Sequence, residues 1–202
     1  MLGICSACGN HEWDKEVKGN IIKCPKCGNE RTFEKLPIYF LTGCSGIGKT
    51  TTAVELQKIT DDFVVLDVDW LRNIAWPQND EEENNLIEQV YCVSKNINQS
   101  KKPVVWTMAG GIDRLHNTYG KRFFSEAKVL ALTAESEAIR KRMTDGRGIE
   151  DAGWIQSSID YNNYFRTHDS LGETKFDTLD CTNGTPAEIA KKVLEWLKKW
   201  AF

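Results

Sequence analysis

The sequence predicts an α/β fold with a five-stranded parallel sheet, preceded by a small cysteine-rich module. Five short apolar runs alternate with stretches of helical periodicity, at residues 38–42, 63–68, 103–108, 128–132 and 176–180. Runs this short and this rich in branched and aromatic residues are typical of buried strands, and their alternation with helices favours a parallel sheet covered on both faces. A change in composition near Leu36-Pro37 separates residues 1–36 from the α/β unit at residues 37–202.

The composition limits the class of protein. The 202 residues are 41% hydrophobic, which is enough for one full core plus a small module. The net charge of -3 argues weakly against a general nucleic-acid binder, which usually has a basic face. We expect no membrane segment and a cytoplasmic location, because no apolar stretch approaches the length of a span. Seven cysteines in such a chain favour metal binding or burial over disulfides.

Four cysteines of the N-terminal module have the spacing of a metal site. Cys5 and Cys8 form one pair, and Cys24 and Cys27 form the other, with fifteen residues between the pairs and a glycine after each. Zn²⁺ prefers four thiolates in a tetrahedron, and such a closed site is structural rather than catalytic. Gly19-Asn20 predicts a turn and Ile21-Ile22 a strand, so the module resembles a zinc ribbon. For the remaining three cysteines we expect burial: Cys44, Cys92 and Cys181.

Helices are predicted between the strands. Apolar residues recur at helical spacing at Ala53, Leu56 and Ile59, and again at Leu86, Val90, Val93 and Ile97. Thr185-Pro186-Ala187-Glu188 predicts the start of a last helix, with Thr185 as the cap and proline in the first position. An apolar stripe follows at Ile189, Val193, Trp196, Leu197 and Trp200.

The strand at residues 38–42 leads into the glycine-rich segment Gly43-Cys44-Ser45-Gly46-Ile47-Gly48-Lys49-Thr50. Strand, loop and helix in this order form the phosphate-binding loop of nucleoside triphosphatases. Backbone N–H groups and a helix N-terminus would hold the phosphates, Lys49 would reach the β- and γ-phosphates, and the Thr50 hydroxyl would ligate Mg²⁺. The residues predicted to bind the nucleotide are Gly43, Ser45, Gly46, Ile47, Gly48, Lys49, Thr50 and Thr51.

Two acids follow the second predicted strand, Asp67 and Asp69. Residues at i and i+2 on a strand point the same way, so both would face the crevice at the carboxyl end of the sheet. The chain lacks the Asn-Lys-x-Asp segment that GTPases use for guanine, which favours ATP. The α/β unit is also too short for a ring-forming ATPase with its lid domain.

The phosphate-binding loop together with Leu66-Asp67-Val68-Asp69-Trp70-Leu71-Arg72 resembles the small P-loop kinases of the adenylate, shikimate, gluconate and adenylylsulfate kinase group. The resemblance covers residues 38–202. It implies the strand order 2-3-1-4-5, with Asp67 in the Mg²⁺ shell and Asp69 at the acceptor, where it orients or deprotonates a hydroxyl. Arg72 matches an acceptor-binding arginine of this group.

Three further segments extend the resemblance. Residues 104–111 resemble the third strand and the acceptor loop of shikimate kinases, which implies that Gly110 and Gly111 bind the acceptor, although Ala109 replaces a third glycine. No acidic residue follows this strand, so the resemblance implies that Asp67 is the carboxylate that binds Mg²⁺. Kinases of this group close a lid over ATP with arginines from the corresponding region. The resemblance therefore implies that Arg142 and Arg147 neutralise charge on the phosphoryl group during transfer. The segment 180–185, with Asn183, takes the place of the adenine-contacting loop.

The sequence therefore predicts an ATP- and Mg²⁺-dependent phosphotransferase that carries a structural Zn²⁺ and acts on a small molecule. Trp70, Trp76 and Trp106 map near the acceptor and offer flat faces, which favours a nucleoside or nucleoside monophosphate. One alternative is a kinase of RNA or DNA ends with the ribbon gripping the strand, although residues 1–35 carry six Lys/Arg against five Asp/Glu. Another is an ATP-dependent switch whose ribbon docks a protein. The sequence leaves the oligomeric state open.

Overall fold

The computed structural model describes residues 2–12 and 15–201. Residues 1, 13 and 14 of the predicted 1–36 unit, and residue 202 of the α/β unit, lie outside this part. The centre of the molecule is a five-stranded sheet in which all neighbouring strands are parallel. Its order is β5-β6-β4-β7-β10, which is 2-3-1-4-5 when these five strands alone are counted along the chain. The strands are β4 (Ile38–Thr42), β5 (Val64–Asp67), β6 (Val104–Thr107), β7 (Ala127–Thr133) and β10 (Asp177–Asp180).

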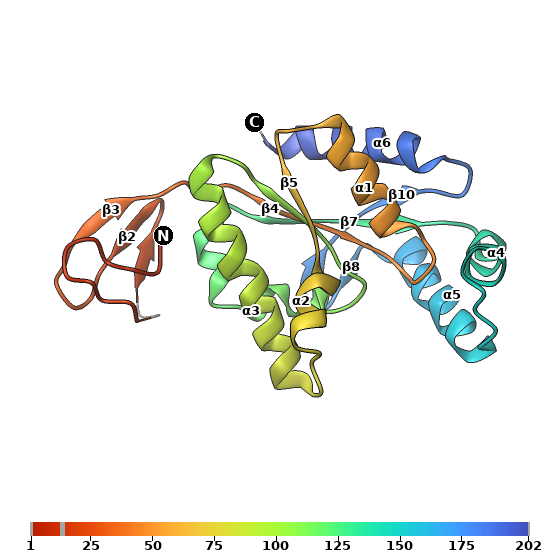
Figure 1. Cartoon of the computed structure of the whole chain (residues 1–202), viewed down its shortest axis with the longest axis horizontal. Helices are drawn as coiled ribbons and strands as arrows, with labels where there is room; N and C mark the ends of the chain where they lie inside the picture. Colours follow the sequence, from red (N-terminus) through yellow and green to blue (C-terminus); the bar gives the residue numbers. More distant parts are fainter. Residues whose placement is uncertain (1, 13–14, 202) are drawn as a thin grey trace.

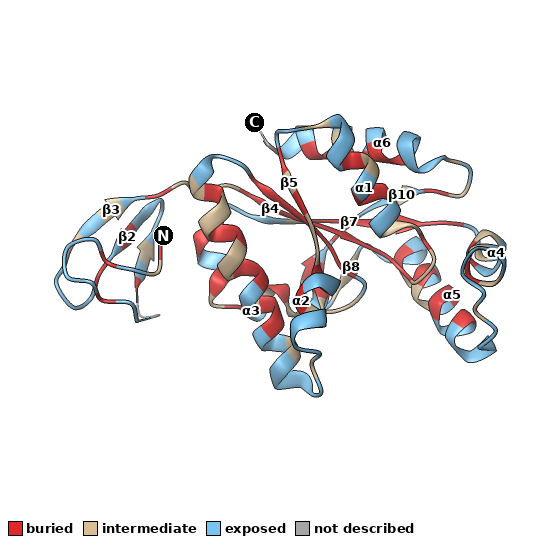
Figure 2. Cartoon of the chain, in the orientation of Figure 1, coloured by how far each residue is buried: buried red, intermediate tan, exposed pale blue. Residues whose placement is uncertain are grey.

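Helices cover both faces of this sheet (Figure 1). On one face lie α1 (Lys49–Ile59) and α6 (Pro186–Ala201), and on the other lies α3 (Asp80–Ile97), preceded by the short α2 (Val68–Ile74). Burial follows the same arrangement, with the sheet and the inward sides of the helices buried (Figure 2). Every residue of β4 is buried, as expected for the central strand of a sheet covered on both faces.

The last helix starts as its sequence predicts. The Thr185 backbone N–H donates to the Glu188 carboxylate at 2.9 Å, and the Glu188 N–H donates back to the Thr185 hydroxyl at 3.3 Å. This reciprocal pair is a capping box that satisfies two N–H groups which the helix leaves free. The predicted stripe is wrong at one position, because Trp200 is 40% exposed and lies against the Lys128 ammonium.

The second strand ends earlier than the apolar run suggests. We expected Asp67 and Asp69 to share a strand, but β5 ends at Asp67 and α2 begins at Val68. The Asp67 Oδ1 atom accepts a hydrogen bond from the Asp69 backbone N–H at 3.0 Å and thereby caps α2. An aspartate in this position favours a helix start, so the chain leaves the sheet one residue after it.

Beyond β7 the chain forms α4 (Ser136–Arg147) and α5 (Ala152–Thr167). A small hairpin follows, β8 (Ser170–Leu171) with β9 (Thr174–Lys175), which the sequence analysis did not predict. Three short 3-10 helices complete the described elements: η1 (Asn98–Ser100), η2 (Ile112–Asn117) and η3 (Gly120–Phe123).

No helix within residues 2–12 and 15–201 has the length and apolar character that a membrane crossing needs.

The N-terminal module is a three-stranded antiparallel sheet of β1 (Glu16–Lys18), β2 (Ile21–Lys23) and β3 (Glu30–Thr32). The first two strands form the predicted hairpin around Gly19-Asn20. Beside this sheet, the two cysteine turns are alike. The Gly9 N–H donates to the Cys5 carbonyl at 2.9 Å, and the Gly28 N–H donates to the Cys24 carbonyl at 2.8 Å. Both glycines have a left-handed φ near 70°, which permits this tight turn.

The turns bring the four predicted sulfurs together. The Sγ atoms of Cys5, Cys8, Cys24 and Cys27 all lie within 4.8 Å of one another, and all seven cysteines are free thiols. The Asn10 amide nitrogen is 3.7 Å from the Cys24 sulfur and donates to it. Four thiol ligands with such a supporting amide fit the donor set and geometry of a structural Zn²⁺ site, and the module is compatible with a zinc ribbon.

The ribbon packs on the α3 side of the α/β unit. Its residues Leu2, Ile22 and Phe33 are buried in the same apolar cluster as α3 and β6. The Leu2 N–H donates to the Asn96 side chain at 3.0 Å, and the Phe33 and Phe123 rings meet edge to face with centroids 5.9 Å apart. These contacts lie at the end of α3 and on η3, shortly before β6 and β7 begin. The ribbon is therefore at the amino ends of the parallel strands.

Candidate active site

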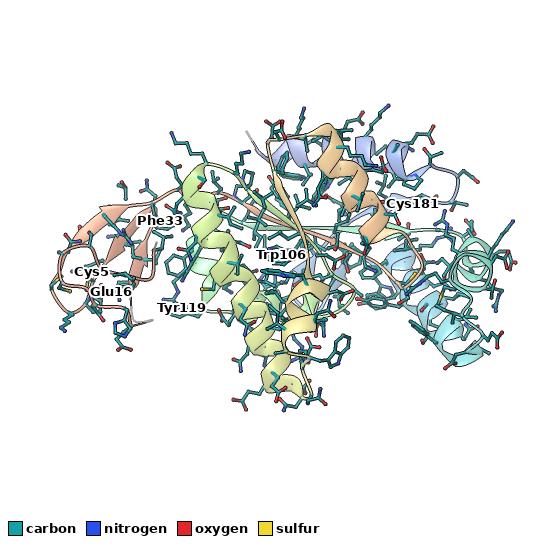
Figure 3. All side chains as sticks on the ribbon, viewed as in Figure 1. Cys5, Glu16, Phe33, Trp106, Tyr119 and Cys181 are labelled. Atoms are coloured by element: carbon teal, nitrogen blue, oxygen red, sulfur yellow. The ribbon has the colours of Figure 1, made fainter. Side chains whose placement is uncertain are left out.

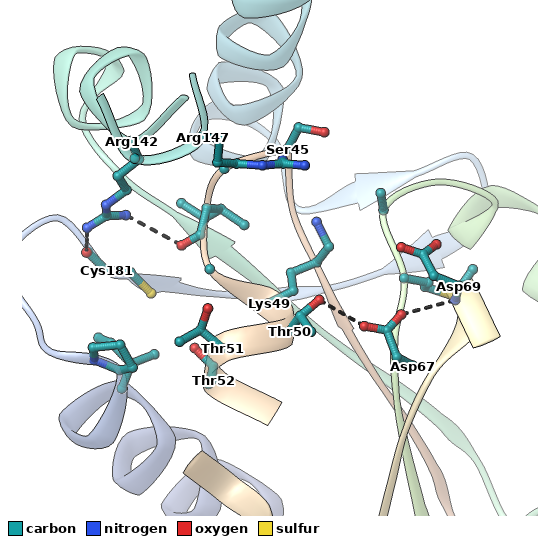
Figure 4. Close-up of a pocket in the computed structure, with 18 of the residues that line it drawn as sticks. Ser45, Lys49, Thr50, Thr51, Thr52, Asp67, Asp69, Arg142, Arg147 and Cys181 are labelled. Atoms are coloured by element: carbon teal, nitrogen blue, oxygen red, sulfur yellow. Dashed lines mark hydrogen bonds between the residues drawn. The ribbon is translucent and has the colours of Figure 1, made fainter. Parts of the chain in front are cut away.

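A cavity of about 880 Å³ opens at the carboxyl ends of the strands (Figure 4). This is the end of an open α/β sheet at which ligands bind. Its walls come from the phosphate-binding loop, α2, the loop after β6, the end of α4, the start of α5 and the loop after β10. The residues that line it outside the phosphate-binding loop and the start of α1 are Asp67, Asp69, Arg72, Trp76, Met108, Ala109, Gly110, Arg142, Gly146, Arg147, Trp154, Cys181, Gly184, Pro186 and Ile189.

The phosphate-binding loop needs its glycines. Gly43 has a φ of 138°, and a Cβ atom there would lie 2.6 Å from the Leu132 carbonyl oxygen. Gly46 has a φ of 76°, and its Cβ would lie 2.6 Å from the Met143 side chain. Gly48 has a φ of 106° and stands at the N-terminus of α1. The loop therefore packs closely against β7 and α4, and it leads through Gly48 into α1, where N–H groups and the helix dipole favour an anion.

Lys49 lies inside this loop. Its Nζ atom donates to the carbonyl oxygens of Gly43 at 2.8 Å and Cys44 at 2.9 Å. Burial lowers the pKa of Lys49, while the nearby carboxylates of Asp67 and Asp69 act in the opposite direction. The half-buried lysine thus lines the cavity with a partly desolvated charge that a phosphate can stabilise.

The two side chains assigned to Mg²⁺ face each other. The Thr50 hydroxyl donates to the Asp67 Oδ2 atom at 2.8 Å, and the other carboxylate oxygen of Asp67 caps α2 (Figure 4). A hydroxyl and a carboxylate at the mouth of a phosphate-binding loop are the hard oxygen ligands that Mg²⁺ prefers, usually together with water and phosphate oxygens. Thr50 and Asp67 therefore fit this ion.

Asp69 lines the same cavity from the first turn of α2. Its backbone N–H is engaged by Asp67, but its carboxylate makes no hydrogen bond with any residue of the described ranges. It is thus available to a ligand. The predicted proximity of the two acids holds, although the start of a helix, not a shared strand, brings them together.

The two predicted lid arginines also line the cavity. Arg142 donates to the Cys181 carbonyl at 2.7 Å and to the Ile47 carbonyl at 3.4 Å, so it ties the phosphate-binding loop to the loop after β10. Arg147 ends α4 and lies 5.7 Å from the centroid of the Trp154 ring. It is close enough to Lys49 to contribute to lowering the lysine pKa.

The other end of the cavity is formed by Cys181 and Gly184 of the loop after β10 and by Pro186 and Ile189 in the first turn of α6. The segment 180–185 thus lines the cavity in part, and its adenine-side position stays a prediction. Asn183 itself is not among the described residues that line the cavity. The Cys181 thiol is buried, and burial raises its pKa to about 11, which keeps it neutral and unreactive.

Only some of the residues predicted to bind the acceptor line the cavity. Arg72 and Gly110 line the cavity, whereas Trp70 and Gly111 are not among its described lining residues. The placement of Trp106 near the acceptor is wrong, because this side chain is fully buried on the α3 side of the sheet, with its indole N–H donating to Ser94 at 2.7 Å (Figure 3). A tryptophan in a strand that is buried on both faces belongs to the core.

Two residues of the site were missed by sequence reasoning. Glu83 binds Arg72 through both carboxylate oxygens, at 2.8 and 3.0 Å. Trp154, in the first turn of α5, lines the cavity near Arg147. Glu83 belongs to an acidic run at the start of α3, which looks like ordinary helix-dipole compensation. No signal in the sequence separates Trp154 from a core tryptophan.

Comparisons with known proteins identify the fold. No protein-family model matches the sequence, and no curated protein matches it. Among solved structures, a sugar kinase from Janibacter sp. HTCC2649 is similar with a TM-score of 0.59 and 19% identity, over 81% of this chain and 95% of that one. A gluconokinase from Sinorhizobium meliloti 1021 has a TM-score of 0.58 and 16% identity, over 85% and 95%. Shikimate kinase from Acinetobacter baumannii, in complex with shikimate, has a TM-score of 0.53 and 19% identity, over 83% and 96%.

These neighbours confirm the resemblance at the level of the fold. The chain has the α/β architecture of the small P-loop kinases, and the three neighbours named above are a sugar kinase, a gluconokinase and a shikimate kinase. At identities below one fifth, the likeness does not transfer a substrate. The chemistry must be argued from the side chains of this site.

Proposed function

We propose that this chain is an ATP- and Mg²⁺-dependent kinase that transfers the γ-phosphoryl group to a small molecule, a nucleoside or nucleoside monophosphate. The observation that carries the proposal is the arrangement at one cavity mouth of Lys49 in its glycine loop, the Thr50–Asp67 pair and the free carboxylate of Asp69. A loop of this kind with a metal pair and a separate acid provides the parts that phosphoryl transfer needs.

Each residue has a distinct task in the proposed reaction. Lys49 and the loop N–H groups bind the β- and γ-phosphates, and Arg147 and Arg142 add positive charge from the lid side. Thr50 and Asp67 would hold Mg²⁺, which neutralises charge on the phosphate oxygens when it is bound. The acceptor hydroxyl oxygen bonds to Pγ while the bond from Pγ to the β–γ bridging oxygen breaks. The hydroxyl proton passes to Asp69 and then to water, and ADP leaves.

Two exposed tryptophans support an acceptor that contains a ring. Trp76 is 62% exposed and Trp154 is 44% exposed, and both line the cavity. Exposed indole faces in a ligand cavity are stacking surfaces, worth about 1–3 kcal/mol for a nucleobase. A monophosphate acceptor would need no base, and Asp69 would then only position it.

The decisive test is ATP consumption against a panel of nucleosides, nucleotides, sugars and sugar acids, with product masses measured. We expect one new mass that is larger by one phosphoryl group, and no such product from Lys49→Ala. ATP binding without any phosphorylated product across the panel would contradict the proposal. It would favour the hypothesis of an ATP-dependent switch.

The position of the ribbon bears on the alternative of a nucleic-acid end kinase. Its contacts with Asn96 and Phe123 place it at the amino ends of the strands, whereas Asp69 is at the carboxyl ends. A strand gripped by the ribbon would have to pass around the sheet to reach the reacting site. We propose instead that the four cysteines bind one Zn²⁺ that stabilises the ribbon, and that the ribbon supports the fold.

A further inference from the structure

The charges of the cavity are divided between its two ends. Of the described residues that line it, four are cationic, and three of these belong to the phosphate side: Lys49 in the loop, and Arg142 and Arg147 on α4. Arg72 on α2 is the fourth, and it lies at the end that also contains Asp69 and Trp76. Recognition of an anionic acceptor at that end would therefore depend on Arg72.

Arg72 already has an anionic partner. Its Nη1 and Nη2 atoms donate to the two carboxylate oxygens of Glu83 at 2.8 and 3.0 Å, the parallel geometry that holds a guanidinium most firmly. The side chains of Arg72 and Glu83 are only 12% and 27% exposed, so water screens the pair weakly. Trp76 covers the guanidinium from one face, at 5.3 Å from its ring centroid.

The net charge at this end is negative. The cation of Arg72 is balanced by Glu83, and the carboxylate of Asp69 is left without a partner among the described residues. A carboxylate or phosphate group would have to share Arg72 with Glu83 and would lie beside Asp69. Like charges at such distances disfavour binding. An alcohol meets no such penalty, since it can accept from a remaining N–H of Arg72 and donate to Asp69.

We infer that the acceptor is uncharged where it meets Asp69, Arg72 and Trp76, so that the substrate is a neutral hydroxyl compound such as a nucleoside and not a monophosphate or a sugar acid. This inference rests on the proposed function and narrows its substrate class. Glu83 is then a specificity-determining residue, because it prevents Arg72 from selecting an anion.

The first experiment compares matched pairs of acceptors with the wild-type chain: uridine with its 5′-monophosphate, adenosine with its 5′-monophosphate, and glucose with gluconate. We expect phosphorylated products from the neutral members, at a kcat/KM at least about tenfold above their anionic partners. Preference for the anionic member of the productive pair would overturn the inference and leave the kinase function intact. A complete lack of product would refute the kinase function, and the second experiment would still decide the charge of this end.

The second experiment needs no turnover. The chain is saturated with Mg²⁺ and a non-hydrolysable ATP analogue and titrated with inorganic phosphate, with tryptophan fluorescence as the signal. Glu83→Gln should bind phosphate about tenfold more tightly than wild type, because it frees Arg72. Glu81→Gln is the matched control, since it removes the same charge from an exposed position in the same turn of α3 and should change nothing.

Two outcomes overturn the inference in this second experiment. One is saturable phosphate binding by the nucleotide-filled wild type with a dissociation constant below about 1 mM, a result that does not depend on how well any variant folds. The other is a folded Glu83→Gln variant, as judged by its thermal melt, that binds phosphate no better than Glu81→Gln. Weak binding by wild type together with a selective gain in Glu83→Gln supports the inference.

Discussion

Asp67 and Asp69 are two residues apart, and substitution by asparagine separates their roles. In the proposed reaction Asp69→Asn removes the group that takes the proton, and the general-base contribution to transfer is about 10²–10⁴-fold. At about 1.4 kcal/mol for each factor of ten, this raises the barrier by about 3–5 kcal/mol. Because the Asp69 carboxylate makes no hydrogen bond in the described structure, the substitution removes little from the fold.

Asp67 has two roles that the variants must separate: it caps α2, and in the proposed reaction it binds Mg²⁺. Its Oδ1 atom caps α2, and asparagine caps a helix as well as aspartate does. Asp67→Asn should therefore melt near wild type yet need more Mg²⁺. Asp67→Ala also loses the cap, which costs about 1 kcal/mol and, in a chain of this size, about 2–4 °C in Tm.

The assay is initial-rate transfer to the acceptor found in the panel, with Mg²⁺ titrated for each variant and thermal melts in parallel. We expect Asp69→Asn to lower kcat at an unchanged Mg²⁺ midpoint, and Asp67→Asn to shift that midpoint upward. The reasoning is wrong if Asp69→Asn keeps most of its kcat, because no base then acts there. It is also wrong if Asp67→Asn leaves the Mg²⁺ midpoint where it was.

Three further predictions can be checked with purified protein. Lys49→Ala should lose about 10²-fold or more in transfer and most of its affinity for an ATP analogue in calorimetry; unchanged affinity would show that the loop is not the triphosphate site. Wild type should contain one zinc per chain in elemental analysis and Cys24→Ser none, with a lowered Tm because the ribbon shares a core with α3; equal metal content would contradict this. The Thr185 N–H lowers the pKa of Glu188, so this carboxylate stabilises the fold above about pH 4.5 and loses its effect as pH falls through the lowered pKa. Melts of Glu188→Gln should differ from wild type at pH 7, and the difference should shrink as the pH falls through the lowered pKa of Glu188.

The parallel sheet could be predicted from the sequence chiefly because β4, β6 and most of β7 are buried, whereas the edge strand β10 is largely exposed. Buried strands appear as continuous apolar runs, and all five predicted runs became strands with ends shifted by at most one residue. The β8–β9 hairpin has only two residues in each strand, which is too short for any periodicity. The early end of β5 depends on one hydrogen bond from the Asp69 N–H to Asp67, which hydrophobic pattern alone does not reveal.

The site could be predicted where local sequence dictates local geometry. Gly43, Gly48 and Lys49 act within one loop, so their spacing is sufficient evidence. The Arg72–Glu83 pair joins two helices, and its formation depends on how α2 and α3 cross, which the sequence does not state. Trp106 lies within the predicted buried strand 103–108, and this position alone favoured the core, whereas Trp76 lies outside the predicted strands and lines the cavity.

The helix α3 connects the two ends of the molecule, and this gives the ribbon a part in the site. Its eighteen residues span about 27 Å, with Glu83 in the first turn and Asn96 near the last. At the far end Asn96 accepts from the Leu2 N–H, and the Lys95 ammonium lies over the Phe123 ring, which itself contacts Phe33 of the ribbon. Through these contacts the ribbon packs against the end of the helix that carries the partner of Arg72. We therefore expect an effect of the ribbon on acceptor choice to pass through the position of α3.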